Sequence, residues 1–148
     1  MTDVDGLDDD AIRALLTGSR RWAVVGASVN PARPSFGVAG FLVQAGFEVT
    51  PVNPGHAGTS LHGRPVAASL DDAAPLEVVD VFREASAALG VVRDVIRIGG
   101  ARAVWMQLGV INEAAAAEGR AAGLVVVMDR CPKIEWRRLG LHAAPHLS

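Results

Sequence analysis

Short runs rich in Val alternate along this chain with longer segments rich in Ala, and this alternation constrains the fold more than any other feature. The runs have the length and β-branched content of buried strands; they occupy residues 22–26, 47–52, 77–82, 103–107 and 124–128. The segments between them have apolar residues at helical spacing; they occupy residues 36–45, 85–98 and 112–122. Strands that alternate with helices are typical of βαβ units. The chain is therefore predicted to be an α/β protein with a mostly parallel sheet.

The two ends of the chain extend this pattern without adding a second domain. Residues 7–17 predict a leading amphipathic helix, and residues 132–139 predict a terminal helix that begins at a proline. Residues 140–148 are expected to form a frayed tail. Because 148 residues suit about one domain and no linker or repeat interrupts them, we expect residues 1–148 to form a single domain.

Composition and charge restrict the class of protein. A single cysteine excludes an internal disulfide, and the sequence has no signal peptide and no apolar run long enough to span a membrane. We therefore expect a cytoplasmic protein without a membrane partner. The formal net charge is -2, and five of the 16 acidic residues lie in the first ten positions. The basic excess elsewhere is too weak for nucleic-acid binding, but it is compatible with a small anionic ligand.

The loop after the first predicted strand, from Gly26 to Gly37, is the strongest candidate for a binding site. It runs through small residues into a helix, an arrangement that presents backbone N–H groups and the positive end of the helix dipole to an anion. Ser35 is predicted to cap this helix, and Arg33 is a candidate phosphate contact. A Val in place of Gly26 is expected to block the ligand without unfolding the protein.

This loop does not have the dinucleotide-binding fingerprint. The spacing G-x-G-x-x-G is missing, since about ten residues separate Gly26 from Gly37. The second strand ends in Asn53 and Pro54 rather than in the acidic residue that binds the ribose hydroxyls of NAD. With no carboxylate to repel a phosphorylated ribose, these residues favour a ligand such as NADP or coenzyme A (CoA) over NAD.

Residues suited to catalysis are few. Asp80 lies inside an apolar strand and is interpreted as a hydrogen-bonded structural carboxylate rather than as a general base. Cys131 follows the last strand beside Arg130, which would favour a reactive thiolate if the thiol were exposed, although a lone cysteine is more often a small buried residue. The four histidines lack the spacing of a zinc motif, so no metal site is predicted.

Five blocks of the sequence, spread in order over residues 22–139, resemble the small single-domain CoA-binding proteins. The blocks are residues 24–28 with 31–38, then 51–54, 79–83, 105–109 and 128–135. Proteins of this kind are similar in fold to the CoA-binding domain of the succinyl-CoA synthetase α subunit and of ADP-forming acyl-CoA synthetases. The resemblance implies a Rossmann-like three-layer αβα fold. A short third strand near residues 65–66 would give the strand order 3-2-1-4-5-6.

The resemblance also implies that CoA binds at the carboxyl edge of the sheet. The loop after the first strand and its helix would hold the pyrophosphate, the ends of the second and fourth strands would flank the adenosine, and the turn after the fifth strand would lie near the pantetheine. The cofactor-binding residues expected on this basis are Gly26, Ala27, Ser28, Arg33, Ser35, Gly37, Asn53, Pro54, Phe82, Arg83, Gln107 and Gly109.

A binding module is expected rather than a ligase. Phosphoryl transfer in the synthetases needs a histidine in a further domain, and none of the four histidines here matches that motif. We therefore assign no catalytic residue, and the ligand is either free CoA or an acyl-CoA. Two alternatives stay open: an NAD(P)-dependent oxidoreductase, and a redox protein in which Cys131 forms a mixed disulfide with CoA. A partner protein or a homo-oligomer also stays open.

Overall fold

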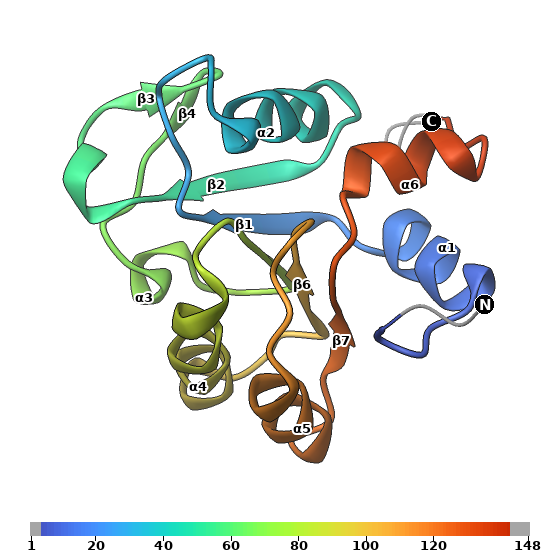
Figure 1. Cartoon of the computed structure of the whole chain (residues 1–148). Coiled ribbons are helices and arrows are strands. Elements are labelled where there is room, and N and C mark those ends of the chain that lie inside the picture. The colour runs from blue at the N-terminus through green and yellow to red at the C-terminus, as the bar shows by residue number, and fades with distance from the viewer. Residues whose placement is uncertain (1–3, 143–148) are drawn as a thin grey trace.

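The computed structural model describes residues 4–142 and has a central parallel sheet of five strands (Figure 1). The strands lie in the order β2-β1-β5-β6-β7. Their bounds are β1 (Arg21–Val25), β2 (Glu48–Val52), β5 (Val78–Val81), β6 (Ala103–Met106) and β7 (Val125–Val127). Every neighbouring pair in this sheet is parallel. The predicted α/β class and the order of the five Val-rich strands are therefore confirmed.

Helices cover both faces of the sheet and complete three layers (Figure 1). One face carries α1 (Asp9–Gly18), α2 (Pro34–Gln44) and α6 (Pro132–Arg138). The other carries α3 (Leu70–Ala73), α4 (Ala88–Ile98) and α5 (Glu113–Ala121). There are also two short 3₁₀ turns: η1 (Pro54–His56) follows β2, and η2 (Ala85–Ala87) precedes α4. The Rossmann-like three-layer arrangement is thus present.

Successive strand residues point to opposite faces of the sheet and so build two hydrophobic clusters. In β1, Trp22 and Val24 pack on the side of α1, α2 and α6, whereas Ala23 and Val25 pack on the side of α3, α4 and α5. The ring centroid of Trp105 in β6 lies 5.5 Å from that of Trp22. Burial on both faces explains why the strands appear in the sequence as continuous apolar runs.

The predicted third strand near residues 65–66 is wrong in its pairing. β4 (Arg64–Pro65) pairs antiparallel with β3 (Ser60–Leu61) in a separate two-stranded sheet, and Ala67 makes an isolated parallel bridge to Val52 of β2. The proline of β4 has no N–H group to donate to a ladder, which restricts it to an edge. The predicted order 3-2-1-4-5-6 is therefore correct for its last five strands. Where it has strand 3 beside strand 2, the structure has only the single bridge between Ala67 and Val52.

Side-chain caps define where two helices begin. The carboxylate of Asp8 accepts a hydrogen bond from the N–H of Ala11 at 2.9 Å and caps α1. Oδ1 of Asn112 accepts one from the N–H of Ala115 at 2.9 Å and caps α5, as its position before an Ala-rich segment predicts. At the other end of the chain, Leu141 packs against the core, and residues 143–148 of the predicted tail lie outside the described residues.

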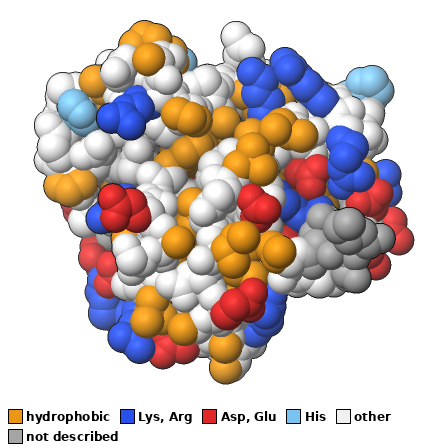
Figure 2. All heavy atoms as spheres, viewed as in Figure 1, with side chains coloured by type: hydrophobic (Ala, Val, Ile, Leu, Met, Phe, Trp, Pro, Cys, Tyr) orange, Lys and Arg blue, Asp and Glu red, His pale blue; other side chains and the backbone are white. Residues whose placement is uncertain are grey.

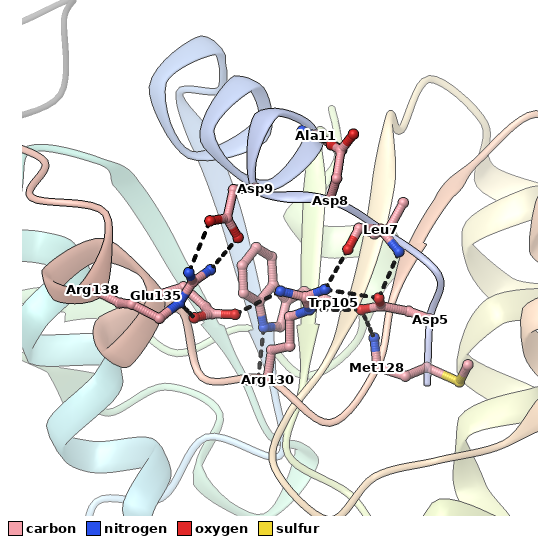
Figure 3. A network of polar contacts seen from close by, with 10 residues as sticks. All are labelled: Asp5, Leu7, Asp8, Asp9, Ala11, Trp105, Met128, Arg130, Glu135 and Arg138. Carbon is pink, nitrogen blue, oxygen red and sulfur yellow. Dashed lines mark hydrogen bonds and ion pairs between the residues drawn. The ribbon is translucent and has the colours of Figure 1, made fainter. Parts of the chain in front are cut away.

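A network of charged side chains joins the N-terminal segment to the end of the sheet (Figure 3). Arg130, just after β7, donates from Nε and Nη2 to the two carboxylate oxygens of Asp5 at 2.8 and 2.9 Å. Its Nη1 donates to Glu135 at 2.8 Å, and Arg138 links Glu135 to Asp9. The side chains of Arg130 and Asp5 are only 4% and 0% exposed. The network therefore fixes α1 and α6 against the last strand from within the protein.

Candidate ligand-binding site

A cleft of about 500 Å³ opens at the carboxyl ends of β1, β5 and β6. β2 lies on one side of β1, and β5 lies on the other side, so the strand order reverses at β1. Open α/β sheets bind their ligands at such a topological switch point. The lining comes from the loop after β1, the start of α2, the end of β5 and the loop after β6: Gly26, Ser28, Arg33, Pro34, Ser35, Phe82, Arg83, Gln107, Leu108 and Val110. Seven of the twelve predicted cofactor-binding residues therefore lie together.

A second hollow of about 410 Å³ adjoins the cleft, and the two share Gly26 and Arg83 in their linings. Asn53 and Pro54 line this hollow, as do residues 68–71 before and within α3. Sequence reasoning missed residues 68–71, although Ser69 with an acidic residue three positions later is a helix-start signal. The two hollows therefore meet at Gly26 and Arg83.

The backbone of the loop after β1 is held by hydrogen bonds within the protein. The N–H groups of Gly26 and Ala27 donate to the carbonyl oxygen of Val52 at 3.0 and 3.3 Å. Nδ2 of Asn53 donates to the carbonyl of Ala27 at 2.8 Å. Ala27 is buried and does not belong to the lining of either hollow. Gly26 and Ala27 therefore shape the loop, but their N–H groups are not free for an anion as the sequence suggested.

Ser35 does not cap the helix, contrary to the prediction. α2 begins two residues before its predicted start, because Pro34 occupies its first position and Arg33 is the N-cap residue. Ser35 therefore lies in the first turn, where its buried Oγ accepts a hydrogen bond from the N–H of Ser28 at 3.0 Å. The side chain ties the loop to the helix. No described residue accepts the N–H of Ser35, in the first turn of α2, or the N–H of Val29, in the loop before it, so these two donors are unpaired.

Two arginines from different segments line the cleft. Arg33 extends from the start of α2, and Arg83 follows β5; both are exposed. Within residues 4–142, neither guanidinium makes a hydrogen bond or an ion pair. An unpaired guanidinium beside a helix N-terminus suits an anionic group such as a phosphate. The electrostatic character of the cleft at this end is therefore positive.

The loop after β6 forms the opposite wall. Gln107 lies there with only 6% of its surface exposed, and its Oε1 is buried without a hydrogen-bond partner. Gly109 adopts a φ of 80° and donates its N–H to Asp129 at 2.8 Å, so it shapes the turn but does not line the cleft. Its neighbours Leu108 and Val110 line the cleft instead. This wall is mostly apolar, in contrast to the arginine side.

The structure also places three further residues that the sequence singled out. Asp80 is completely buried, and no described residue donates a hydrogen bond to either carboxyl oxygen, so its interpretation as an ionised carboxylate that accepts hydrogen bonds is wrong. Burial raises its pKa well above 3.8. Cys131 is 6% exposed and packs in the core, which removes the exposure that a reactive thiol needs. Gly37 lines a separate hollow beside His62 on the outer side of α2.

Charges of both signs share the surface in the view of Figure 2, where groups of hydrophobic side chains lie among Lys, Arg, Asp and Glu. A nucleic-acid-binding surface instead gathers basic side chains along one stripe. Residues 4–142 contain no group of three or more His, Cys, Asp or Glu side chains placed to hold a metal ion. No helix in the same range has the length and apolarity to cross a membrane.

The fold and the position of the cleft define a Rossmann-like α/β domain with a binding site at the carboxyl edge of its sheet. Residues 20–137 match the CoA binding domain family. YneT, an uncharacterized protein of Bacillus subtilis (strain 168), is 34% identical over 123 residues, which are 83% of this chain and 90% of YneT. The chain belongs to the CoA binding domain family.

Solved structures agree with this assignment. A hypothetical protein from Pyrococcus horikoshii OT3 has 36% sequence identity and a TM-score of 0.88, over 94% of this chain and 96% of that one. The cell-free ID.343 structure from Thermus thermophilus has 36% identity and a TM-score of 0.84, over 90% of this chain and 99% of that one. The three-layer fold is therefore shared over nearly the whole length of these proteins.

Proposed function

We propose that this protein binds CoA or an acyl-CoA along the two adjoining hollows and that it is a binding module rather than an enzyme. The observation that carries this proposal is the junction at Gly26, where the cleft and a second hollow meet beside the unpaired Arg83. CoA is divided in a matching way, with phosphates at its centre, an adenosine at one end and a pantetheine arm at the other.

Each part of the ligand has a matching part of the site. Arg33 and Arg83, with the free N–H groups at the start of α2, receive the phosphates. Asn53 and Pro54 form a wall for the adenosine. Two carboxylates line the same hollow, Asp71 and Asp94, but both pair with Arg97, at 2.9 and 3.5 Å, so their charge is offset. The apolar wall beside Gln107 receives the pantetheine.

Calorimetric titration with CoA, dephospho-CoA, NADP and NAD tests this proposal. We expect CoA to bind most tightly and NAD not to bind, because the site has two guanidinium groups for phosphates and no free carboxylate at the end of β2. Absence of CoA binding at high micromolar concentration would overturn the proposal. Tighter binding of NADP than of CoA would instead support the oxidoreductase alternative.

Arginine variants locate the phosphates within the site. Arg33→Met and Arg83→Met should each weaken CoA binding about 10-fold, the effect of losing one charge-assisted hydrogen bond. Arg20→Met is the matched control, because Arg20 is equally exposed but precedes β1 at the opposite edge of the sheet. Equal affinities for the three variants would place the ligand elsewhere.

A further inference from the structure

Three buried polar atoms without hydrogen-bond partners lie on one face of the sheet: Oδ1 and Oδ2 of Asp80 and Oε1 of Gln107. Asp80 in β5 is opposite Trp105 in β6, and the N–H of Gln107 donates to the carbonyl of Val81 and so continues the ladder. Side chains two residues apart on a strand share a face. Gln107 therefore lies one diagonal step from Asp80, within reach of its long side chain.

The other buried polar side chains are already occupied. Ser19 accepts from the indole of Trp22, Ser35 accepts from Ser28, and Arg130 holds Asp5 and Glu135 in the ionic network. None of them lies within hydrogen-bond distance of the carboxyl oxygens of Asp80 or of Oε1 of Gln107. Among the described buried polar residues, Asp80 and Gln107 are thus the pair without partners.

Because Oε1 is the buried, unpartnered atom of the Gln107 amide, it can pair with Asp80 only if the carboxyl group of Asp80 supplies a proton. All three orphaned atoms are acceptors when Asp80 is ionised, and a buried acceptor without a donor destabilises the folded state. Burial raises the pKa of Asp80 well above 3.8, which favours the neutral acid. A neutral carboxylic acid carries one O–H donor.

We propose that Asp80 donates a hydrogen bond from its carboxyl O–H to Oε1 of Gln107 and thereby turns the Gln107 amide so that its N–H₂ group faces the cleft and binds a carbonyl oxygen of the ligand. Gln107 is then a binding residue, and Asp80 is a positioning residue that touches no ligand atom. The side chain of Gln107 suits this role, because it lines the cleft and no described residue accepts a hydrogen bond from its Nε2.

The surroundings of Gln107 indicate an uncharged acceptor. Leu108 and Val110 flank it, whereas Arg33 and Arg83 lie on the phosphate side of the cleft. A neutral amide in an apolar wall is suited to a carbonyl group, such as an amide of the pantetheine arm or the thioester of an acyl-CoA. This assignment rests on the proposed function, since it names which part of CoA the wall recognises.

The ligand half of the proposal is tested by comparing CoA with adenosine 3′,5′-bisphosphate, which lacks the pantetheine arm. Gln107→Leu should weaken CoA binding about 5- to 10-fold, the effect of one neutral hydrogen bond, and leave the bisphosphate unchanged. Asp80→Leu should have the same selective effect, although it does not line the cleft. Asp80→Asn should restore CoA affinity, because its amide N–H₂ can also donate to Oε1 of Gln107. Unchanged CoA affinity in Asp80→Leu would overturn the positioning role.

Infrared spectroscopy tests the protonated acid without any ligand. At pH 7 the wild type should show the carbonyl stretch of a protonated carboxyl group, which disappears in Asp80→Asn and shifts in Gln107→Leu. Absence of this band would overturn the hydrogen bond between the two side chains. If the wild type fails to bind CoA, the proposed function and the carbonyl contact are both wrong. The infrared band would still show whether Asp80 donates a hydrogen bond to Gln107.

Discussion

Gly26 lies directly against the backbone of Phe82: a β carbon built on Gly26 would be 2.4 Å from the carbonyl oxygen of Phe82. The residue also has a φ of 83°, a conformation that favours glycine. The expectation that Gly26→Val blocks the ligand without unfolding the protein therefore conflicts with the packing. This glycine joins two neighbouring strand ends, and any side chain there disturbs both.

We expect Gly26→Ala to lower the free energy of unfolding by at least about 2 kcal/mol, from the strained backbone and the overpacked contact together. Urea denaturation measures the loss. Gly37→Ala is the control, because a β carbon on Gly37 meets nothing within 4 Å and the residue lies inside α2. That change should leave the protein as stable or stabilise it by up to about 1 kcal/mol. Equal stabilities of the two variants would contradict the close approach to Phe82.

The pair between Asp5 and Arg130 should be among the most sensitive contacts of the fold. Asp5→Ala leaves the buried guanidinium of Arg130 without its bidentate partner, so we expect a loss of about 3–5 kcal/mol in the free energy of unfolding. Asp10→Ala should change little, because Asp10 lies in an exposed pair with Arg13. A small effect of Asp5→Ala in thermal or urea unfolding would show that the N-terminal segment is not fixed by this network.

The same carboxylate predicts how stability depends on acid. Burial raises the pKa of Asp5, but hydrogen bonds from Arg130 and from the N–H groups of Leu7 and Met128 outweigh it and hold the pKa below 3.8. The contribution of Asp5 is therefore present above pH 3.8 and is lost as the pH falls below that value. Unfolding of wild type and Asp5→Asn at several pH values should show a difference that shrinks in acid; a constant difference would exclude this linkage.

Asp80 predicts the opposite dependence of stability on pH. Because burial raises its pKa, the unfolded chain releases this proton more readily than the native protein, and stability falls as the pH rises from 3.8 toward the native pKa. Asp80→Asn has no proton to release, so its stability relative to wild type should increase with pH. Denaturation curves between pH 5 and pH 8 measure this trend, and parallel pH profiles for the two proteins would speak against a buried neutral acid.

The thiol of Cys131 should be protected in the native protein. It is 6% exposed and packs among core residues such as Trp105 and Trp136. We expect an aromatic disulfide reagent to react slowly with the folded protein and rapidly in denaturant. Diamide and CoA together should give no CoA adduct in intact-mass analysis of the folded protein. A rapid adduct that Cys131→Ser abolishes would revive the mixed-disulfide alternative.

Periodicity predicted the sheet well because each Val-rich strand is buried on both faces, as Trp22 and Ala23 of β1 illustrate. It failed around β3 and β4, where two-residue strands are too short to show a pattern. In the site, residue type indicated Arg33 and the family resemblance indicated Arg83, and both line the cleft. The roles of Ser35 and Asp80 instead depend on contacts between distant segments. A serine before an apolar helix predicts a cap, and no local signal shows that Pro34 has already taken the first helical position.

The contact between Asp5 and Arg130 spans 125 positions of the chain. During translation the N-terminal segment is made first, yet its carboxylate acquires its partner only after β7 has been synthesised. A nascent chain cut short before Arg130 therefore carries an N-terminal segment with no ionic anchor, and long-range closure of this kind comes late in folding. The anchoring of the first described residues thus depends on the segment that follows β7.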